Sequence, residues 1–174
     1  MKLKLALLYF VLLFSCAVCA NEEGKISTPD REKIAEKIKK LPVSEYPFIE
    51  RSSVDWLIKP EGYKAAILAG KDGKSVILSN GLVERVFRVF PNLATIDIVN
   101  RMTGESMLRA ASSEGELVID GTQWSLGGLD GQPERGYLNL DWLEKMEPLP
   151  HSFIVEDFET ADKYRAVLME KGIL

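Results

Sequence analysis

The sequence predicts a mainly β protein, an antiparallel β-sandwich with a short N-terminal helix and a C-terminal helical tail. Between residues 55 and 158, short runs rich in Val, Ile, Leu and Phe alternate with turn residues at the spacing of strands. Apolar residues follow helical spacing on either side of this region. The expected organisation is a signal peptide at 1–20, a leader with an amphipathic helix at 21–54, the sandwich domain at 55–158 and a helical tail at 159–174.

The first twenty residues have the three parts of a secretory signal peptide. Lys2 and Lys4 provide a positive start, and residues 5–14 form a short apolar run. Small side chains at 18–20 then offer a cleavage site. The apolar run is too short to cross a bilayer as a stable helix. We therefore expect an exported protein, periplasmic or extracellular.

Both cysteines of the chain, Cys16 and Cys19, lie in this segment. Cleavage after Ala20 leaves none for disulfides or thiol catalysis, which suits a bacterial periplasm or surface. Residues 13–16 also resemble a lipobox, although Phe14 fits that motif poorly. Lipidation at Cys16 would make the protein a surface lipoprotein, and we expect contact with a membrane only in that case.

The charge of the chain argues against nucleic-acid binding. Loss of Lys2 and Lys4 leaves 20 of the 22 basic residues against 26 acidic ones, a net charge of −6. Such a surface repels phosphate backbones. The 154 residues that remain of 174 after removal of the first 20 are enough for one domain with a substantial core.

Residues 28–41 predict the N-terminal helix. Thr28 suits the N-cap, Pro29 suits the first turn, and Pro42 ends the pattern. The apolar stripe is formed by Ile34, Ile38 and Leu41. Because this stripe is thin, it favours a helix packed on the edge of the domain over a helix that binds a partner.

Strand-like segments and tight turns then alternate along the chain. The segments are 63–70, 75–80, 82–90, 94–100, 106–111, 116–121, 122–126 and 152–159. Asp72-Gly73, Asn80-Gly81 and Asp120-Gly121 favour hairpin turns, because glycine adopts a positive φ at little cost. Broken alternation within 82–90 predicts a bulge or burial on both faces of the strand. Residues 160–172 show helical spacing and end at Gly172.

No catalytic residue, metal site or cofactor is expected within this chain. His151, the single histidine, has no cysteine or histidine partner, and we expect it in a loop. Nucleophile elbows, phosphate loops and dinucleotide fingerprints are absent from the sequence. Glycoside hydrolysis requires two carboxylates beside the scissile bond, and Glu114 with Glu116 or Asp97 with Asp120 are the pairs open to that role. Acids this common usually lie on solvated strand faces, so an enzyme complete in this chain stays open but is not favoured.

Residues 124–146 concentrate aromatic side chains and glycines. Gly127-Gly128 and residues 131–133 favour turns, and residues 138–146 favour a short helix. The candidate carbohydrate-binding set consists of Trp124, Gln132, Tyr137 and Trp142, since sugars are held by aromatic faces and amide hydrogen bonds. Each tryptophan taken singly is more often buried in a core than stacked on a ligand.

Four phrases carry a family resemblance: 80–82, 91–95, 102–105 and 127–132. With them, roughly residues 55–145 resemble the N-terminal β-rich region of exported bacterial proteins in the α-galactosidase-like glycoside hydrolase group. In that group a sandwich precedes a catalytic barrel, and the barrel holds the catalytic acids. The resemblance therefore implies a non-catalytic accessory domain, with a barrel domain or a carbohydrate as its partner and no catalytic residue to carry over.

Two functions follow as expectations. The first is an accessory domain of an exported carbohydrate-active protein, which contributes to barrel packing or glycan contact. The alternative is a stand-alone periplasmic or surface interaction protein whose exposed sheet docks a protein partner. The marginal helix after residue 159 fits a truncated product, a fragmentary gene model or a free-standing descendant of the sandwich, and the sequence leaves these open.

Overall fold

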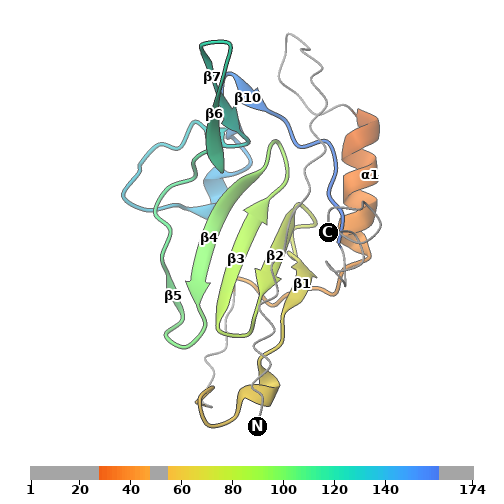
Figure 1. Cartoon of the computed structure of the whole chain (residues 1–174), viewed down its shortest axis with the longest axis vertical. Coiled ribbons are helices and arrows are strands. Elements are labelled where there is room, and N and C mark those ends of the chain that lie inside the picture. The colour runs from red at the N-terminus through yellow and green to blue at the C-terminus, as the bar shows by residue number, and fades with distance from the viewer. Residues whose placement is uncertain (1–27, 48–54, 161–174) are drawn as a thin grey trace, which may run out of the picture.

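The computed structural model describes residues 28–47 and 55–160, and within them the chain is mainly β with antiparallel sheets and one α-helix (Figure 1). The helix α1 spans Thr28–Lys39, as predicted, and a short 3-10 helix η1 spans Pro60–Gly62. The expected signal peptide, the leader up to residue 27 and the tail from residue 161 lie outside the described residues.

The largest sheet is an antiparallel meander of five strands in chain order. Its strands are β1 (Ala66–Ala69), β2 (Ser75–Ser79), β3 (Val83–Arg88), β4 (Ala94–Asn100) and β5 (Glu105–Ser106). The predicted hairpin turns are confirmed, with Gly73 at φ 64° and Gly81 at φ 84°. Strand structure in the predicted segment 106–111 was wrong beyond Ser106, because β5 pairs with β4 only at Glu105 and Ser106.

The sequence predicted a bulge or burial on both faces within 82–90; burial on both faces of β3 is confirmed, whereas the bulge lies on the neighbouring strand β4. The register between β3 and β4 shifts between Val86 and Phe87, so Val86 pairs with Asp97 and Phe87 with Thr95. Ile96 is the extra residue on β4. As side chains alternate across a sheet, Glu84 and Val86 share one face of β3 and Phe87 lies on the other.

Helix α1 covers one face of this sheet. Ile34 and Ile38 are 0 and 1% exposed and pack against Val76, Phe87 and other apolar side chains. Val155 and Phe158, from the last described segment, belong to the same cluster. The apolar stripe of α1 is thus buried in the core. This agrees with the prediction of a helix packed on the domain rather than on a partner.

The opposite face carries a second apolar cluster. Leu143 and Met146 are buried there against Ile77 and Val86 of the sheet, next to Tyr46. Among the described residues, α1 therefore covers one face and the segment around residues 138–146 the other. A second sheet stacked face to face on this one, as a sandwich requires, stays a prediction.

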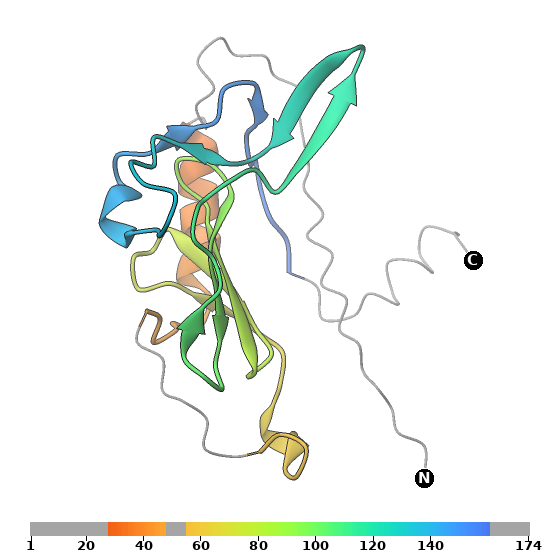
Figure 2. The same ribbon diagram turned by 90° about the vertical axis from the view of Figure 1, so that its left-hand side faces the viewer.

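A three-stranded sheet lies at one end of the meander. Its strands are β6 (Gly115–Ile119), β7 (Thr122–Leu126) and β10 (Ser152–Phe153), in the order β10-β7-β6. Figure 2 shows the β6–β7 hairpin projecting away from the body of the molecule. A two-stranded sheet of β8 (Leu129–Asp130) and β9 (Glu147–Pro148) completes the fold. The predicted strand 152–159 pairs only at its first two residues.

Candidate functional site

Tyr137, which is exposed, and Trp142, which is half-buried, form an aromatic pair. Their ring centroids lie 5.1 Å apart with the planes inclined at 45°, and Tyr137 is 57% exposed. Trp142 closes the 3-10 helix η2 (Leu140–Trp142), where the sequence predicted a short helix. The Asn139 side chain accepts a hydrogen bond from the backbone N–H of Asp141 at 3.0 Å and so caps the start of η2.

Gln132 fixes the loop that carries this pair. Its Oε1 accepts a hydrogen bond from the backbone N–H of Ala111 at 3.0 Å. Its Nε2 donates to the backbone oxygens of Arg109, Glu134 and Tyr137. Both ends of the amide are thereby engaged inside the protein, so Gln132 positions Tyr137 rather than offering free hydrogen bonds to a ligand.

Two buried apolar side chains and one carboxylate anchor the loop from below. Leu143 and Met146 are each 3% exposed. Between them in sequence, Glu144 accepts hydrogen bonds from Lys74 at 2.6 Å and from Arg88 at 2.5 Å. The pKa of Glu144 is lowered by these bonds, the Lys74 bond contributing most. The aromatic pair therefore stands on a segment held by packing and by charge.

Arg88 is the buried centre of this attachment. The residue is 3% exposed, and its guanidinium donates to Asp72 at 2.7 Å, to the Phe90 backbone oxygen at 2.7 Å and to Glu144. Donation from three guanidinium nitrogens to three separate acceptors suits the planar, multi-donor arginine better than lysine. Sequence reasoning missed Arg88. The available signal was an arginine within the apolar run of residues 86–90, where a buried charge must find partners.

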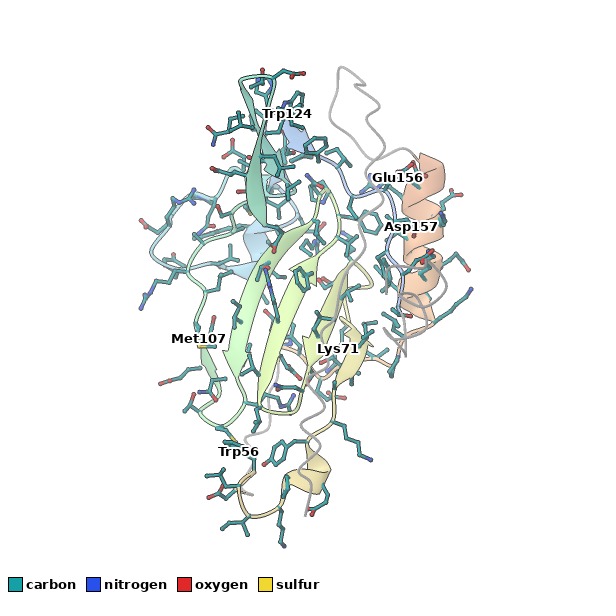
Figure 3. All side chains as sticks on the ribbon, in the orientation of Figure 1. Trp56, Lys71, Met107, Trp124, Glu156 and Asp157 are labelled. Atoms are coloured by element: carbon teal, nitrogen blue, oxygen red, sulfur yellow. The ribbon has the colours of Figure 1, made fainter. Side chains whose placement is uncertain are left out.

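Trp124 lies elsewhere, on β7 of the projecting hairpin (Figure 3). Its ring contacts His151 edge-on, with centroids 6.1 Å apart, and Phe153 at 5.5 Å. The residue is half-buried. The structure thus brings Gln132, Tyr137 and Trp142 together on one loop and places Trp124 in a different aromatic contact.

The carboxylates considered for catalysis are occupied by structural contacts. Glu114 forms an ion pair with Arg85 and accepts a hydrogen bond from the Thr95 backbone. Glu116 accepts a hydrogen bond from Gln123 at 2.8 Å. Asp97 lies on β4, whereas Asp120 lies in the turn of the hairpin, so these two belong to different sheets.

A polar cluster around Tyr46 also escaped sequence reasoning. The Tyr46 hydroxyl donates to Asp97 at 3.1 Å, and the Ser106 hydroxyl donates to the other oxygen of Asp97 at 2.5 Å. Burial, and then the Asp97 charge, raise the pKa of Tyr46 above its usual value. On the same sheet face, Glu84 is 0% exposed and forms an ion pair with Arg101 at 2.5 Å, while its Oε2 has no hydrogen-bond partner among the described residues.

Residues 28–47 and 55–160 contain neither a metal-ligand cluster nor a membrane-spanning helix. In this part of the chain, no three His, Cys, Asp or Glu side chains gather in a way that could hold a metal ion. No helix there has the length and apolar character needed to span a bilayer.

Comparisons of the chain with family models, with curated proteins and with solved structures found no match. The resemblance to the α-galactosidase-like group therefore stays a prediction from the quoted phrases. The proposed function depends on the contacts of Tyr137, Trp142 and Gln132.

Proposed function

We propose that this chain is a non-catalytic accessory domain of an exported carbohydrate-active protein and that it contacts glycan through Tyr137 and Trp142. The observation that carries the proposal is an aromatic pair presented on a loop whose position is fixed by Gln132, Glu144 and two buried side chains. Preorganised aromatic faces bind with little loss of conformational entropy. The structural contacts made by Glu114, Asp97 and Glu116 support a role without catalysis.

The sandwich arrangement and the helical tail at 159–174 are parts of this proposal. Antiparallel pairing throughout the five-stranded sheet supports the sandwich. Export, in periplasmic or lipid-anchored form, is supported by the composition of residues 1–20.

Affinity electrophoresis of the chain in gels that contain soluble polysaccharides tests glycan contact. Tyr137→Ala should weaken binding about tenfold or more, which corresponds to about 1.4 kcal/mol of lost stacking. Tyr137→Phe keeps the ring and should bind like the wild type. Tyr137 is the decisive position, because its exposure leaves the fold intact when the ring is removed.

Trp124→Ala provides the comparison between the two aromatic sites. If glycan binds at the pair alone, this variant keeps the wild-type affinity, and if Trp124 forms a second contact, the affinity falls. Equal retardation of the wild type and Tyr137→Ala by a polysaccharide that binds the chain would overturn the assignment to the pair.

The exposed apolar hairpin favours the alternative function, a stand-alone interaction protein. The size of the native product distinguishes this alternative from an accessory domain. An immunoblot with antibody against residues 55–145 should show a band well above the 19.5 kDa of this chain if a barrel follows. A band at or just below that mass would contradict the accessory role and favour the stand-alone protein.

A further inference from the structure

The outer strand of the projecting hairpin carries exposed apolar side chains. Leu117, Val118 and Ile119 of β6 are 43, 73 and 44% exposed. β6 is the last strand in the order β10-β7-β6, and no strand among the described residues lies on its outer side. An apolar edge strand of this kind is an open template for pairing with another chain.

The register of the hairpin shows which backbone groups face outward. Asp120 and Gly121 form a two-residue turn with φ of 50° and 77°, and Ile119 pairs with Thr122. In such a hairpin the residues that flank the turn exchange both backbone hydrogen bonds, and bonded and non-bonded pairs then alternate. Leu117 and Ile119 therefore bond to β7, and the N–H and C=O of Val118 point to the free edge.

Alternation of side chains gives the edge a defined pattern on each face. Leu117 and Ile119 lie on the face that also carries Trp124, because Leu117 pairs with Trp124. Glu116 and Val118 alternate onto the opposite face, and Asp120 follows β6 in the turn. A strand added to this edge thus meets Leu117 and Ile119 on one face and Glu116 and Val118 on the other, with a second carboxylate, Asp120, in the turn four residues after Glu116.

The same pattern opposes pairing between two copies of β6. In an antiparallel pair centred on Val118, Glu116 of one copy lies opposite Asp120 of the other. Like charges directly opposite each other across a strand pair are destabilising. The edge therefore favours an occupant with the opposite charge.

We infer that β6 binds an extended segment of another protein by strand addition. The segment carries basic residues at its first and fifth positions, opposite Asp120 and Glu116, and apolar residues at its second and fourth, opposite Ile119 and Leu117. Backbone hydrogen bonds to Val118 provide affinity, and the alternate side chains provide specificity. This surface is independent of the aromatic pair at Tyr137 and Trp142.

Two synthetic peptides test the inference on the full chain. One has the sequence Thr-Lys-Val-Thr-Val-Lys-Thr, and its control has glutamate in place of both lysines. The lysine peptide should bind at least tenfold more tightly by calorimetry, and it should shift the backbone amide resonances of residues 116–120. Equal affinity for both peptides, or shifts elsewhere on the protein, would overturn it.

Two variants assign the binding to the edge. Val118→Pro removes an outward N–H and keeps the β7 ladder, so binding of the lysine peptide should be lost while the circular dichroism spectrum is retained. Val118→Thr keeps the N–H and should bind normally. Unchanged binding by Val118→Pro would overturn strand addition. Tyr137→Ala, at the aromatic pair, serves as a control and should leave the peptide affinity unchanged.

Discussion

Gly127 joins two parts of the fold at a point where a side chain has no room. Its φ is +62°, and a Cβ built on it would lie 2.2 Å from the Leu93 backbone oxygen. That oxygen accepts a hydrogen bond from Gly128 at 2.6 Å, and the Gly127 N–H donates to Phe153. The end of β7 is thereby held against the start of β4.

Gly127→Ala should destabilise the protein far more than Gly73→Ala. Gly73 has nearly the same φ, +64°, but no heavy atom within 4 Å of the position of a Cβ. The Gly73 change should cost about 1 kcal/mol from the left-handed backbone alone. The Gly127 change must also displace backbone, and we expect more than about 4 kcal/mol. Urea unfolding of both variants measures the difference, and equal costs would show that the contact with Leu93 is unimportant.

Buried charges are the residues that sequence reasoning located least well. Glu84 and Arg88 lie in a strand predicted from its apolar residues, and both are buried. Their partners, Arg101 and Glu144, are 17 and 56 positions away in the sequence. A strand pattern indicates which face of the strand is covered. The partner of a buried charge, however, depends on tertiary contacts that no local pattern contains.

Helix α1 is attached to the last described segment through Asp157. Its carboxylate accepts contacts from Lys33 and Lys37, each at 2.6 Å. Burial of the carboxyl raises its pKa, but the hydrogen bonds from both lysines outweigh burial and lower the pKa to about 2 from 3.8. The carboxylate therefore stabilises the folded state while it is charged.

Asp157→Asn should lower stability at neutral pH and lose its effect in acid. A lowered folded-state pKa means that the contribution is present above pH 3.8 and is lost as the pH falls towards 2. Urea unfolding at pH 7, 4 and 2 should give a difference from wild type that shrinks across this range. Glu159→Gln, an exposed change two residues away, should differ little from wild type at every pH. A difference that persists undiminished at the lowest pH would contradict the assignment to the carboxylate.

At the scale of elements, strands and turns were predictable where periodicity and glycine position agreed. The helix, the meander through β4 and the β6–β7 hairpin follow the predicted segments closely. Segments 106–111 and 152–159 share the composition of strands, yet each pairs for two residues at most. Three residues of these segments are buried in the two clusters without pairing to a strand: Ala111, Val155 and Phe158. Apolar composition thus specifies burial more firmly than it specifies ladder formation.

For the molecule as a whole, two separate surfaces are proposed to bind partners: the aromatic pair and the β6 edge. Sequence composition predicted the loop that carries Tyr137 and Trp142 as a candidate site, but it could not show that Gln132 forms hydrogen bonds within the protein or that Trp124 lies in a different contact. It predicted a docking sheet as the alternative function but not which strand is exposed, because the exposure of Leu117, Val118 and Ile119 depends on how the hairpin projects (Figure 2).

Reversal of one charge on the β6 edge should convert the protein into a dimer. Glu116→Lys places a lysine opposite Asp120 of a second copy in antiparallel pairing, so repulsion becomes attraction at both ends of the paired strands. Light scattering after size-exclusion chromatography should show a monomeric wild type and a dimeric variant at the highest soluble concentration. Glu61→Lys, an exposed change at η1, should stay monomeric. A monomeric Glu116→Lys protein would show that charge does not control pairing at this edge.

Val155 and Phe158 pack in the same cluster as Ile34 and Ile38, near the other end of the described chain. A chain that leaves the ribosome or a translocation channel from its N-terminus can pair β1 to β5 early, since these strands are neighbours in sequence. The helix face of the sheet stays incomplete until residue 158 has followed, more than a hundred positions after α1. The core can therefore close only after the last described residues have been synthesised. We expect the domain to stay incompletely folded during synthesis for longer than the sequence-adjacent pairing of β1 to β5 alone would require.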